Sequence, residues 1–293
     1  MILDGKIVAA DIKQQLKEEI DAAVANGRRR PYLVIVSVGD DPASKVYIKN
    51  KIKAADEVGI DVFHFPMAVL EDGSPTTEYV QGIVANLNAD DSVDGIMVQL
   101  PLPSNLDERA IIDAIDPAKD VDGLTTTNIG RLRSGQDCLK PCTAAGIIDL
   151  CKYYNIELDG KDVTIIGRSN IVGKPLADLM MAEGATVTQC HSHTHNLDFH
   201  IQGADVVISA IGKPEHFGLS NFKGWHDAVI DVGINRTETG RLCGDIRFEE
   251  VKDCCGGITP VPGGVGPMTV AELMKNVVIA WKKNVGEENE ERG

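Results

Sequence analysis

Residues 163–175 read Val163-Thr164-Ile165-Ile166-Gly167-Arg168-Ser169-Asn170-Ile171-Val172-Gly173-Lys174-Pro175, and this stretch decides how the chain folds. Four apolar or β-branched residues end at a glycine, a short polar loop follows, and a second glycine opens a segment with helical periodicity. This order predicts a strand, a tight turn and a helix. Backbone N–H groups and the positive end of the helix dipole then converge, which suits a phosphate. Alone, the spacing is also compatible with a plain turn between strand and helix.

Strands and helices continue to alternate after this stretch. Further strands are expected at residues 186–190, 204–211 and 228–234. Such alternation is typical of a parallel, doubly wound sheet. We therefore expect residues 141–269 to form a Rossmann-like domain that binds a dinucleotide.

The chain before residue 140 alternates in the same way, which predicts a second α/β domain over residues 1–140. A helix at 269–283 follows the Rossmann-like domain, and we expect residues 270–293 to pack back on the first domain, with a cleft between the two domains. The elements expected in the first domain are helices at 6–26, 43–55, 76–87 and 107–115, and strands at 32–38, 62–67 and 95–100.

Composition excludes several classes of protein. The formal net charge of -15 argues against nucleic-acid binding, so an anionic ligand must be met by local cations and amide dipoles. Seven cysteines without a C-x-x-C pair argue against a disulfide framework and a zinc knuckle. The N-terminus lacks signal-peptide features, and no apolar run has the length that a bilayer requires. We expect a cytoplasmic protein with no membrane partner.

Polar side chains stand at three places in the first domain. Ser44, Tyr47 and Lys51 share one face of the helix at 43–55, either as a ligand-binding row or as a solvated face. Gln99 ends a buried-type strand, where ligands bind in open α/β folds or where a glutamine simply caps the strand. In the loop Lys119-Asp120-Val121-Asp122-Gly123, we expect one carboxylate to bind a ligand and the other to cap the loop.

The end of the second strand of a dinucleotide fold selects the cofactor, because an acidic residue there binds the ribose of NAD. Here the chain reads Cys190-His191-Ser192-His193-Thr194, with no acid. Together with Arg168 in the glycine loop, this favours NADP over NAD. A rival interpretation is a metal cluster of His191, His193 and His195, although no carboxylate or thiolate pair accompanies them.

The stretch from Gly256 to Thr269 is dense in glycine and proline. It predicts a shaped loop whose backbone can approach a ligand closely.

Taken together, these segments resemble the bifunctional methylenetetrahydrofolate dehydrogenase/methenyltetrahydrofolate cyclohydrolase family. The resemblance covers nearly the whole chain. The segments that carry it are Ser44-Lys45-Val46-Tyr47-Ile48-Lys49-Asn50-Lys51, Val98-Gln99-Leu100-Pro101-Leu102-Pro103, Lys119-Asp120-Val121-Asp122-Gly123, Gly167-Arg168-Ser169-Asn170-Ile171-Val172-Gly173, Asp231-Val232-Gly233-Ile234-Asn235 and Thr259-Pro260-Val261-Pro262-Gly263-Gly264-Val265-Gly266-Pro267-Met268-Thr269.

This resemblance implies an enzyme that oxidises 5,10-methylenetetrahydrofolate with NADP and hydrolyses the methenyl product to 10-formyltetrahydrofolate. It further implies a homodimer that serves one-carbon metabolism and purine biosynthesis. Lys51 is implied as the catalytic lysine, Gln99 as its polar neighbour, Tyr47 as the ring that stacks on the folate and Asp122 as the carboxylate that holds the pterin. Near the substrate we expect Pro262, Gly263 and Val265; the cofactor residues are Gly167, Arg168, Ser169, Ile171, Val172, Gly173, Ser192, His193, Ile234 and Thr269.

The chain departs from the family pattern at two positions. Ala144 stands where the family often has a second proline, and His193 where it usually has a lysine or arginine. Because histidine is largely neutral at pH 7, Arg168 must then share or carry the cofactor's 2'-phosphate.

Two rival functions remain open on the sequence. A short-chain dehydrogenase also uses serine, tyrosine and lysine, but there the tyrosine and lysine follow the glycine loop in the same domain. A non-catalytic nucleotide sensor would keep the fold and lose the chemistry, which the joint presence of Lys51, Gln99 and Asp122 disfavours.

Overall fold

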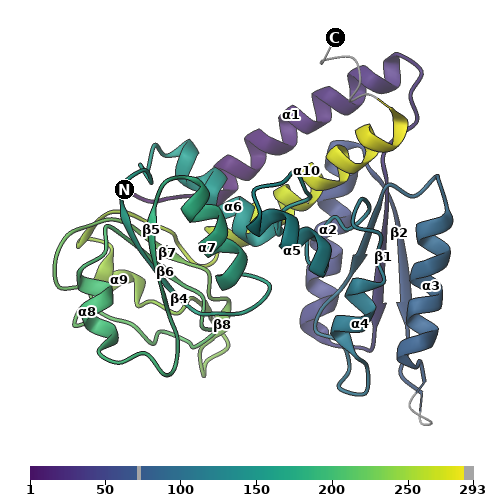
Figure 1. Cartoon of the computed structure of the whole chain (residues 1–293). Coiled ribbons are helices and arrows are strands. Elements are labelled where there is room, and N and C mark those ends of the chain that lie inside the picture. The colour runs from purple at the N-terminus through teal and green to yellow at the C-terminus, as the bar shows by residue number, and fades with distance from the viewer. Residues whose placement is uncertain (71–73, 287–293) are drawn as a thin grey trace. The chain divides into compact units, whose positions relative to one another are not determined.

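The computed structural model of the chain describes residues 1–70 and 74–286, in two compact units. The three-stranded unit comprises Asp11–Cys142 and the chain from Val270 onward. The five-stranded unit comprises Met1–Ala10 and Thr143–Thr269. Figure 1 labels the elements of both units. In the described part of the chain no helix is long and apolar enough to cross a membrane.

A parallel sheet in the order β2-β1-β3 forms the centre of the three-stranded unit. Its strands are β1 (Tyr32–Val38), β2 (Asp61–Met67) and β3 (Gly95–Val98). The next strand in the chain, β2, pairs with one edge of β1, and the following strand, β3, pairs with the other edge. The strand order therefore reverses beside β1, and ligands bind at the carboxyl ends of strands at such a point. Gln99 follows β3 directly at this edge, as predicted, and its N–H donates to the carbonyl of Val36.

Helix α2 (Pro42–Val58) has a defined start and end. Asp41 caps the first turn by accepting from the N–H of Ser44 at 2.7 Å, and Pro42 occupies the first turn, where no backbone donor is needed. Gly59 ends the helix with φ of 89°. The other helices of this unit are α3 (Thr77–Ala89), α4 (Glu108–Asp113), α5 (Thr126–Arg133), most of α1 (Gly5–Ala25) and most of α10 (Val265–Val285).

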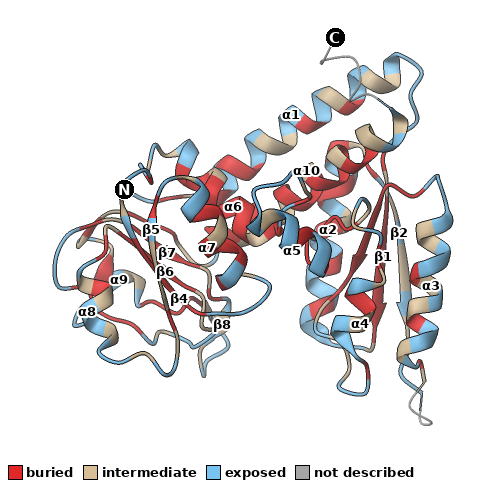
Figure 2. Ribbon diagram, in the orientation of Figure 1, coloured by how far each residue is buried: buried red, intermediate tan, exposed pale blue. Residues whose placement is uncertain are grey.

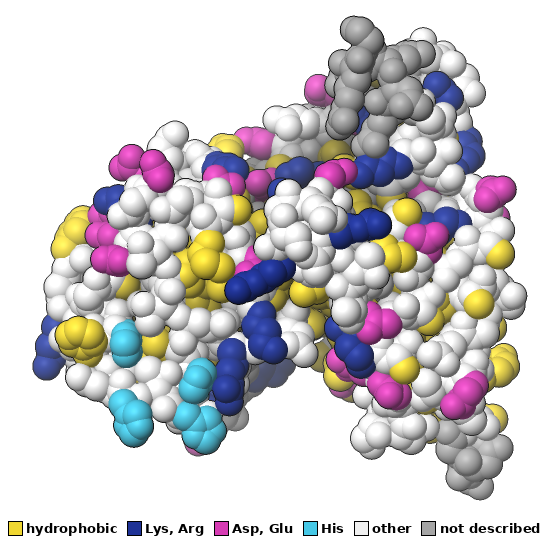
Figure 3. All heavy atoms as spheres, in the orientation of Figure 1, with side chains coloured by type: hydrophobic (Ala, Val, Ile, Leu, Met, Phe, Trp, Pro, Cys, Tyr) yellow, Lys and Arg dark blue, Asp and Glu magenta, His cyan; other side chains and the backbone are white. Residues whose placement is uncertain are grey.

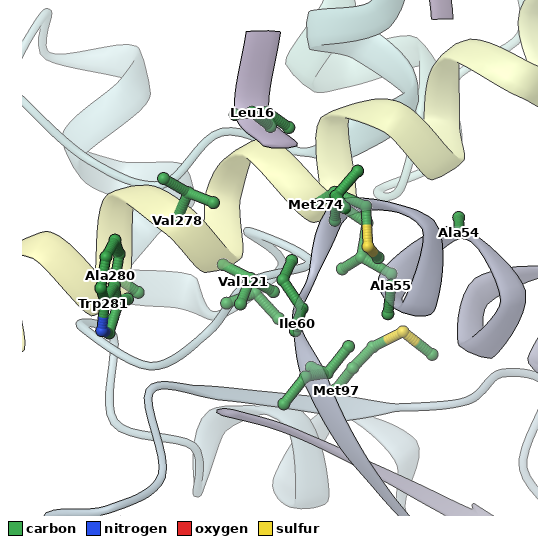
Figure 4. Packing of buried hydrophobic residues seen from close by; sticks show 14 of the residues in the cluster. Leu16, Ala54, Ala55, Ile60, Met97, Val121, Met274, Val278, Ala280 and Trp281 are labelled. Carbon is green, nitrogen blue, oxygen red and sulfur yellow. The ribbon is translucent and has the colours of Figure 1, made fainter. Parts of the chain in front are cut away.

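The sheet of this unit is buried on both faces. One face packs Leu33, Ile35 and Met97 against α2 and α10, as Figure 4 shows for Met97, Ala55 and Met274. The other face packs Val34 and Val36 with residues of α3 and α4. Figure 2 shows α10 buried along much of its length, although it is the last helix in the chain.

The five-stranded unit has a parallel sheet in the order β10-β7-β6-β4-β5. The strand order reverses at β4, so β4 and β6 lie side by side with their carboxyl ends at the expected ligand edge. Its elements are α6 (Cys142–Tyr153), β4 (Asp162–Ile166), α7 (Gly173–Ala182), β5 (Thr186–Cys190), α8 (Leu197–Gln202), β6 (Val206–Ser209), β7 (His226–Asp231), the antiparallel pair β8 (Asn235–Arg236) and β9 (Leu242–Cys243), α9 (Phe248–Val251) and β10 (Cys255–Ile258).

Two features of the predicted C-terminal loop were wrong. The residues from Gly256 to Ile258 belong to β10, an edge strand paired with β7, because a parallel partner supplies the order that the glycines lack. Helix α10 begins at Val265 and not near Thr269, since Gly266 and Pro267 fall in its first turn, where a proline is tolerated. The short helices α5, α8 and α9 were not predicted.

Residues Met1–Ala10 belong to the five-stranded unit. The sequence analysis instead placed them in the first domain, over residues 1–140. The N–H of Leu3 donates to the carbonyl of Ile258, and Ile2 forms a parallel bridge with the same residue. These backbone bonds continue the sheet next to β10. The predicted cleft stays a prediction, and residues 287–293 of the predicted segment 270–293 lie outside the described part of the chain.

Asp94 anchors the amino ends of the strands in the three-stranded unit. Its carboxylate, with a fully buried side chain, accepts two hydrogen bonds from the Arg29 guanidinium at 2.6 and 2.7 Å. It also accepts from the N–H of Tyr32 and the side-chain amide of Asn284 on α10, each at 2.8 Å. One carboxylate thus ties together β1, β3 and α10.

We expect Asp94→Ala to lower the free energy of unfolding of this unit by about 3 kcal/mol, because it removes a buried carboxylate that accepts four hydrogen bonds. Urea denaturation measures the change. Asp61→Ala is the control, because it removes only an exposed ion pair with Arg30 and should change stability by less than about 0.5 kcal/mol. Equal effects of the two substitutions would contradict the anchoring role.

Candidate functional site

The Lys51 amine is buried in the three-stranded unit. Lys51 lies one turn after Tyr47 on α2 and is only 9% exposed. Its Nζ donates to Gln99 Oε1 at 3.0 Å and lies 3.2 Å from the Met97 sulfur. Burial lowers the pKa of Lys51, and the negative charge of Asp122 opposes this shift. The amine therefore loses its proton more readily than an exposed lysine does.

Asp122 completes this group from the loop after residue 119. Burial raises the pKa of Asp122, whereas the positive charge of Lys51 and a hydrogen bond with the Cys142 thiol lower it. The Cys142 thiol is itself buried, and burial together with the charge of Asp122 raises its pKa well above the usual value. The thiol consequently stays protonated and can act as a donor.

Asp120 caps this loop, as the sequence analysis predicted for one of its two carboxylates. It is fully buried and accepts from the N–H groups of Gly123 and Thr125 and from the amide of Asn128. Asp122 interacts electrostatically with Lys51, and its predicted contact with a ligand stays a prediction. Tyr47 is 37% exposed, with its ring at the same face of α2 as Lys51.

The glycine loop of the five-stranded unit lies where the strand order reverses. Gly167 follows β4 with φ of 133°, and a Cβ there would come within 2.5 Å of the carbonyl oxygen of Ala210, which follows β6. A Cβ on Gly173 would collide with the carbonyl of Gly167. Both positions therefore require glycine. The Ser169 hydroxyl accepts from the N–H groups of Val172 and Gly173 and so closes the loop onto the start of α7.

Arg168 lies near the histidines that end β5. Burial lowers the pKa of His191, and the nearby charges of Arg168 and His193 lower it further. The N–H of His193 donates to His191 Nδ1 at 3.1 Å, and the two rings stand edge to face. Figure 3 shows histidine side chains, in cyan, exposed together on one face of this unit. An exposed arginine beside these histidines can receive a phosphate.

Two buried carboxylates organise the neighbouring loops. Asp245 accepts from the Ser209 hydroxyl, from the N–H groups of Ile211 and Lys213 and from the Asn235 amide. Asp231, at the end of β7, accepts from the N–H groups of Gly233, Asp245 and Ile246. Burial raises the pKa of Asp231 to about 7 against these hydrogen bonds. The sequence analysis did not identify this pair.

Three further predicted residues of this unit, Gly263, Ile234 and Thr269, lie around the start of α10. Gly263 has φ of 115°, and a Cβ there would lie 3.1 Å from Lys6 Cε. Thr269 bonds to the Thr143 hydroxyl at 3.1 Å. Ile234 is exposed, and its Cδ1 lies 3.7 Å from the Cβ position of Gly266. The contacts of Pro262, Val265, Ile171 and Ser192 with a ligand stay predictions.

Sequence reasoning missed Cys142 and Met97 as neighbours of Lys51 and Asp122. Cys142 can be seen in the sequence, but its hydrogen bond to the carbonyl of Val121, 21 residues earlier, cannot be predicted from neighbouring residues. Met97 alternates with Gln99 along β3, and this alternation places both on one face.

The fold and these two groups of residues define a class of α/β protein in which a dinucleotide-type glycine loop accompanies a second sheet that carries a buried amine beside a carboxylate. The chain belongs to the tetrahydrofolate dehydrogenase/cyclohydrolase family. The family's catalytic domain matches residues 3–122, and its NAD(P)-binding domain matches residues 141–285.

Individual relatives match over nearly the full length. The chain is 48% identical to the bifunctional protein FolD of Agathobacter rectalis over 96% of this chain and 99% of the relative. The crystal structure of the bifunctional dehydrogenase/cyclohydrolase FolD from Campylobacter jejuni has a TM-score of 0.93 and 42% identity, over 97% of this chain and 99% of that chain. A Trypanosoma brucei relative, solved with NADP and an inhibitor, has a TM-score of 0.91 and 35% identity, over 98% of each chain.

We expect Gly173→Ala to weaken NADP binding by at least about tenfold, equivalent to 1.4 kcal/mol, because its Cβ displaces the glycine loop. Gly82→Ala is the control, since Gly82 lies within α3 and a Cβ there meets no atom within 4 Å. Fluorescence titration with NADPH measures both variants. Unchanged affinity in Gly173→Ala would show that the loop does not hold the cofactor.

Proposed function

We propose that this chain oxidises 5,10-methylenetetrahydrofolate with NADP and hydrolyses the methenyl product to 10-formyltetrahydrofolate. The observation that carries the proposal is the buried Lys51 amine, bonded to Gln99 and facing Asp122, in a member of this family. The family match argues against a short-chain dehydrogenase, and the intact lysine site argues against a non-catalytic sensor.

Asp122 and Tyr47 would hold the folate. A pterin presents an amino group beside a ring N–H, and a carboxylate can accept from both in parallel. Burial raises the pKa of Asp122, and the hydrogen bond with the Cys142 thiol opposes this shift and so favours the ionised form that this recognition needs. The partly exposed ring of Tyr47 offers a flat surface for the pterin and aminobenzoate groups.

Lys51 would move the protons of the hydrolytic step. Water adds to the bridging carbon of the methenyl cation and loses a proton, which the neutral amine accepts. The bond from this carbon to N5 then breaks, N5 takes up a proton and the new hydroxyl loses one, so that one proton is released overall. Burial lowers the pKa of Lys51 and so favours the neutral amine, and Gln99 Oε1 accepts from this amine and orients it.

The glycine loop fits a dinucleotide. Its glycines leave room for close backbone approach, and the positive end of the α7 dipole lies beside them. Arg168 would bind the 2'-phosphate of NADP with help from Ser192 and His193. When bound, NADP supplies the hydride acceptor for the dehydrogenase step.

We further propose a cytoplasmic homodimer that takes tetrahydrofolate derivatives and serves one-carbon metabolism and purine biosynthesis. The support for these points is membership of the family.

We expect Lys51→Ala to lower the cyclohydrolase rate by about 100-fold or more, since the general acid and base is removed. Absorbance of the methenyl compound follows its hydrolysis directly, and NADPH formation follows the dehydrogenase. Lys53→Ala on the exposed side of α2 is the control and should keep both rates. Unchanged methenyl hydrolysis in Lys51→Ala would remove Lys51 from the mechanism.

We expect Arg168→Ala to raise the KM for NADP by about tenfold or more and to leave the KM for NAD nearly unchanged. A charge-assisted bond to phosphate contributes about 1.5–3 kcal/mol, and NAD lacks that phosphate. A second substitution, His193→Lys, should have the opposite effect. It adds a cation beside Arg168 and should lower the KM for NADP. Equal effects on both cofactors would place Arg168 outside the 2'-phosphate site.

A further inference from the structure

We propose that Asn276 on α10 is a positioning residue that sets the place of the Asp122 carboxylate for folate binding. The inference rests on the proposed function, because it assumes that Asp122 receives the pterin. Asn276 is 4% exposed and belongs, like Asp122, to the three-stranded unit.

The Asn276 side chain joins two backbone segments that are distant in sequence. Its Nδ2 donates to the carbonyl oxygens of Val121 and Lys140, each at 2.8 Å. It also lies 3.5 Å from the Cys142 sulfur. A side-chain amide nitrogen carries two hydrogens, so the two carbonyls use both.

These two segments contact each other directly at Gly123. Its φ is 71°, and a Cβ there would come within 2.6 Å of the Pro141 nitrogen. The Cys142 thiol adds a bond to the Val121 carbonyl at 3.3 Å. The Val121 carbonyl belongs to the peptide that leads into Asp122, so its position determines where the Asp122 side chain starts.

Helix α10 provides a rigid support for Asn276. Met274, Val278 and Trp281 are buried in one cluster with Val121. Figure 4 shows Val121 below α10, near Val278. The Asn276 amide is therefore fixed both by α10 and by the two carbonyls that it binds. Substitution of Asn276 removes this connection between the helix and the Asp122 loop, and it changes no residue that is proposed to contact the substrate.

A purely structural bond of the same kind exists on the same helix. Asn284 lies eight residues later, and its Nδ2 donates to the Asp91 carbonyl at 2.9 Å and to Asp94 Oδ1 at 2.8 Å. It supports the other end of the sheet. Asn284→Ala thus removes two hydrogen bonds from α10 as Asn276→Ala does, but far along the helix from Asp122.

The test compares Asn276→Ala with Asn284→Ala in the full chain. Both should unfold at lower temperature, because each loses two hydrogen bonds that join α10 to other segments of the chain. Only Asn276→Ala should raise the KM for methylenetetrahydrofolate, by about tenfold, because a misplaced carboxylate binds the pterin less well. The KM for NADP should stay unchanged in both variants.

Equal folate KM values in the two variants would overturn the inference, and so would a parallel rise in the KM for NADP. Failure of the proposed function is distinguishable, because the unsubstituted chain would then not oxidise methylenetetrahydrofolate at all. If Asn276→Ala does not fold, Asn276→Ser is used in its place, because serine keeps one hydrogen-bond donor. The expected result is a folate KM above that of the unsubstituted chain. A folate KM in Asn276→Ser equal to that of the unsubstituted chain would contradict the positioning role.

Discussion

An amine that is taken out of water must find other partners or give up its proton, and this constraint shapes the three-stranded unit. Around Lys51 the chain supplies one amide oxygen, one thioether sulfur and a carboxylate. A thioether sulfur is only a weak acceptor, so these partners replace the hydration of an ammonium ion only in part. They hold the amine in place while leaving its charge easy to remove, as proton transfer near neutral pH requires.

The two sheets place their functional residues by the same rule. In each, the chain departs from one strand in two directions, and the residues that matter follow the strands where the order reverses. Gln99 occupies this place after β3, and Gly167 occupies it after β4. Topology thus explains why residues from distant parts of the sequence gather at one edge of each sheet. The chemistry differs because one edge carries buried ionisable groups and the other carries glycines.

Local pattern predicted most of the elements, because strand ends and helix faces can be read from neighbouring residues. The pairing of Lys51 with Gln99 was predicted from the resemblance to the family, and the structure confirms it. It failed where order comes from a distant partner. Strand β10 contains Gly256 and Gly257, which disfavour a strand until β7 pairs with it. The contacts of Cys142 and Asn276 with the Asp122 loop depend on how α10 packs, and no local signal carries that information.

The buried carboxylates of Asp231 and Asp245 affect when the chain loses the conformational entropy of the loops around them. Together they accept hydrogen bonds from the loops that follow β6 and β7 and from Asn235, the first residue of β8. The conformational entropy of these loops is therefore lost when the chain folds. A ligand that contacts them meets backbone already held by the protein's own hydrogen bonds, so its affinity does not have to compensate for loop ordering.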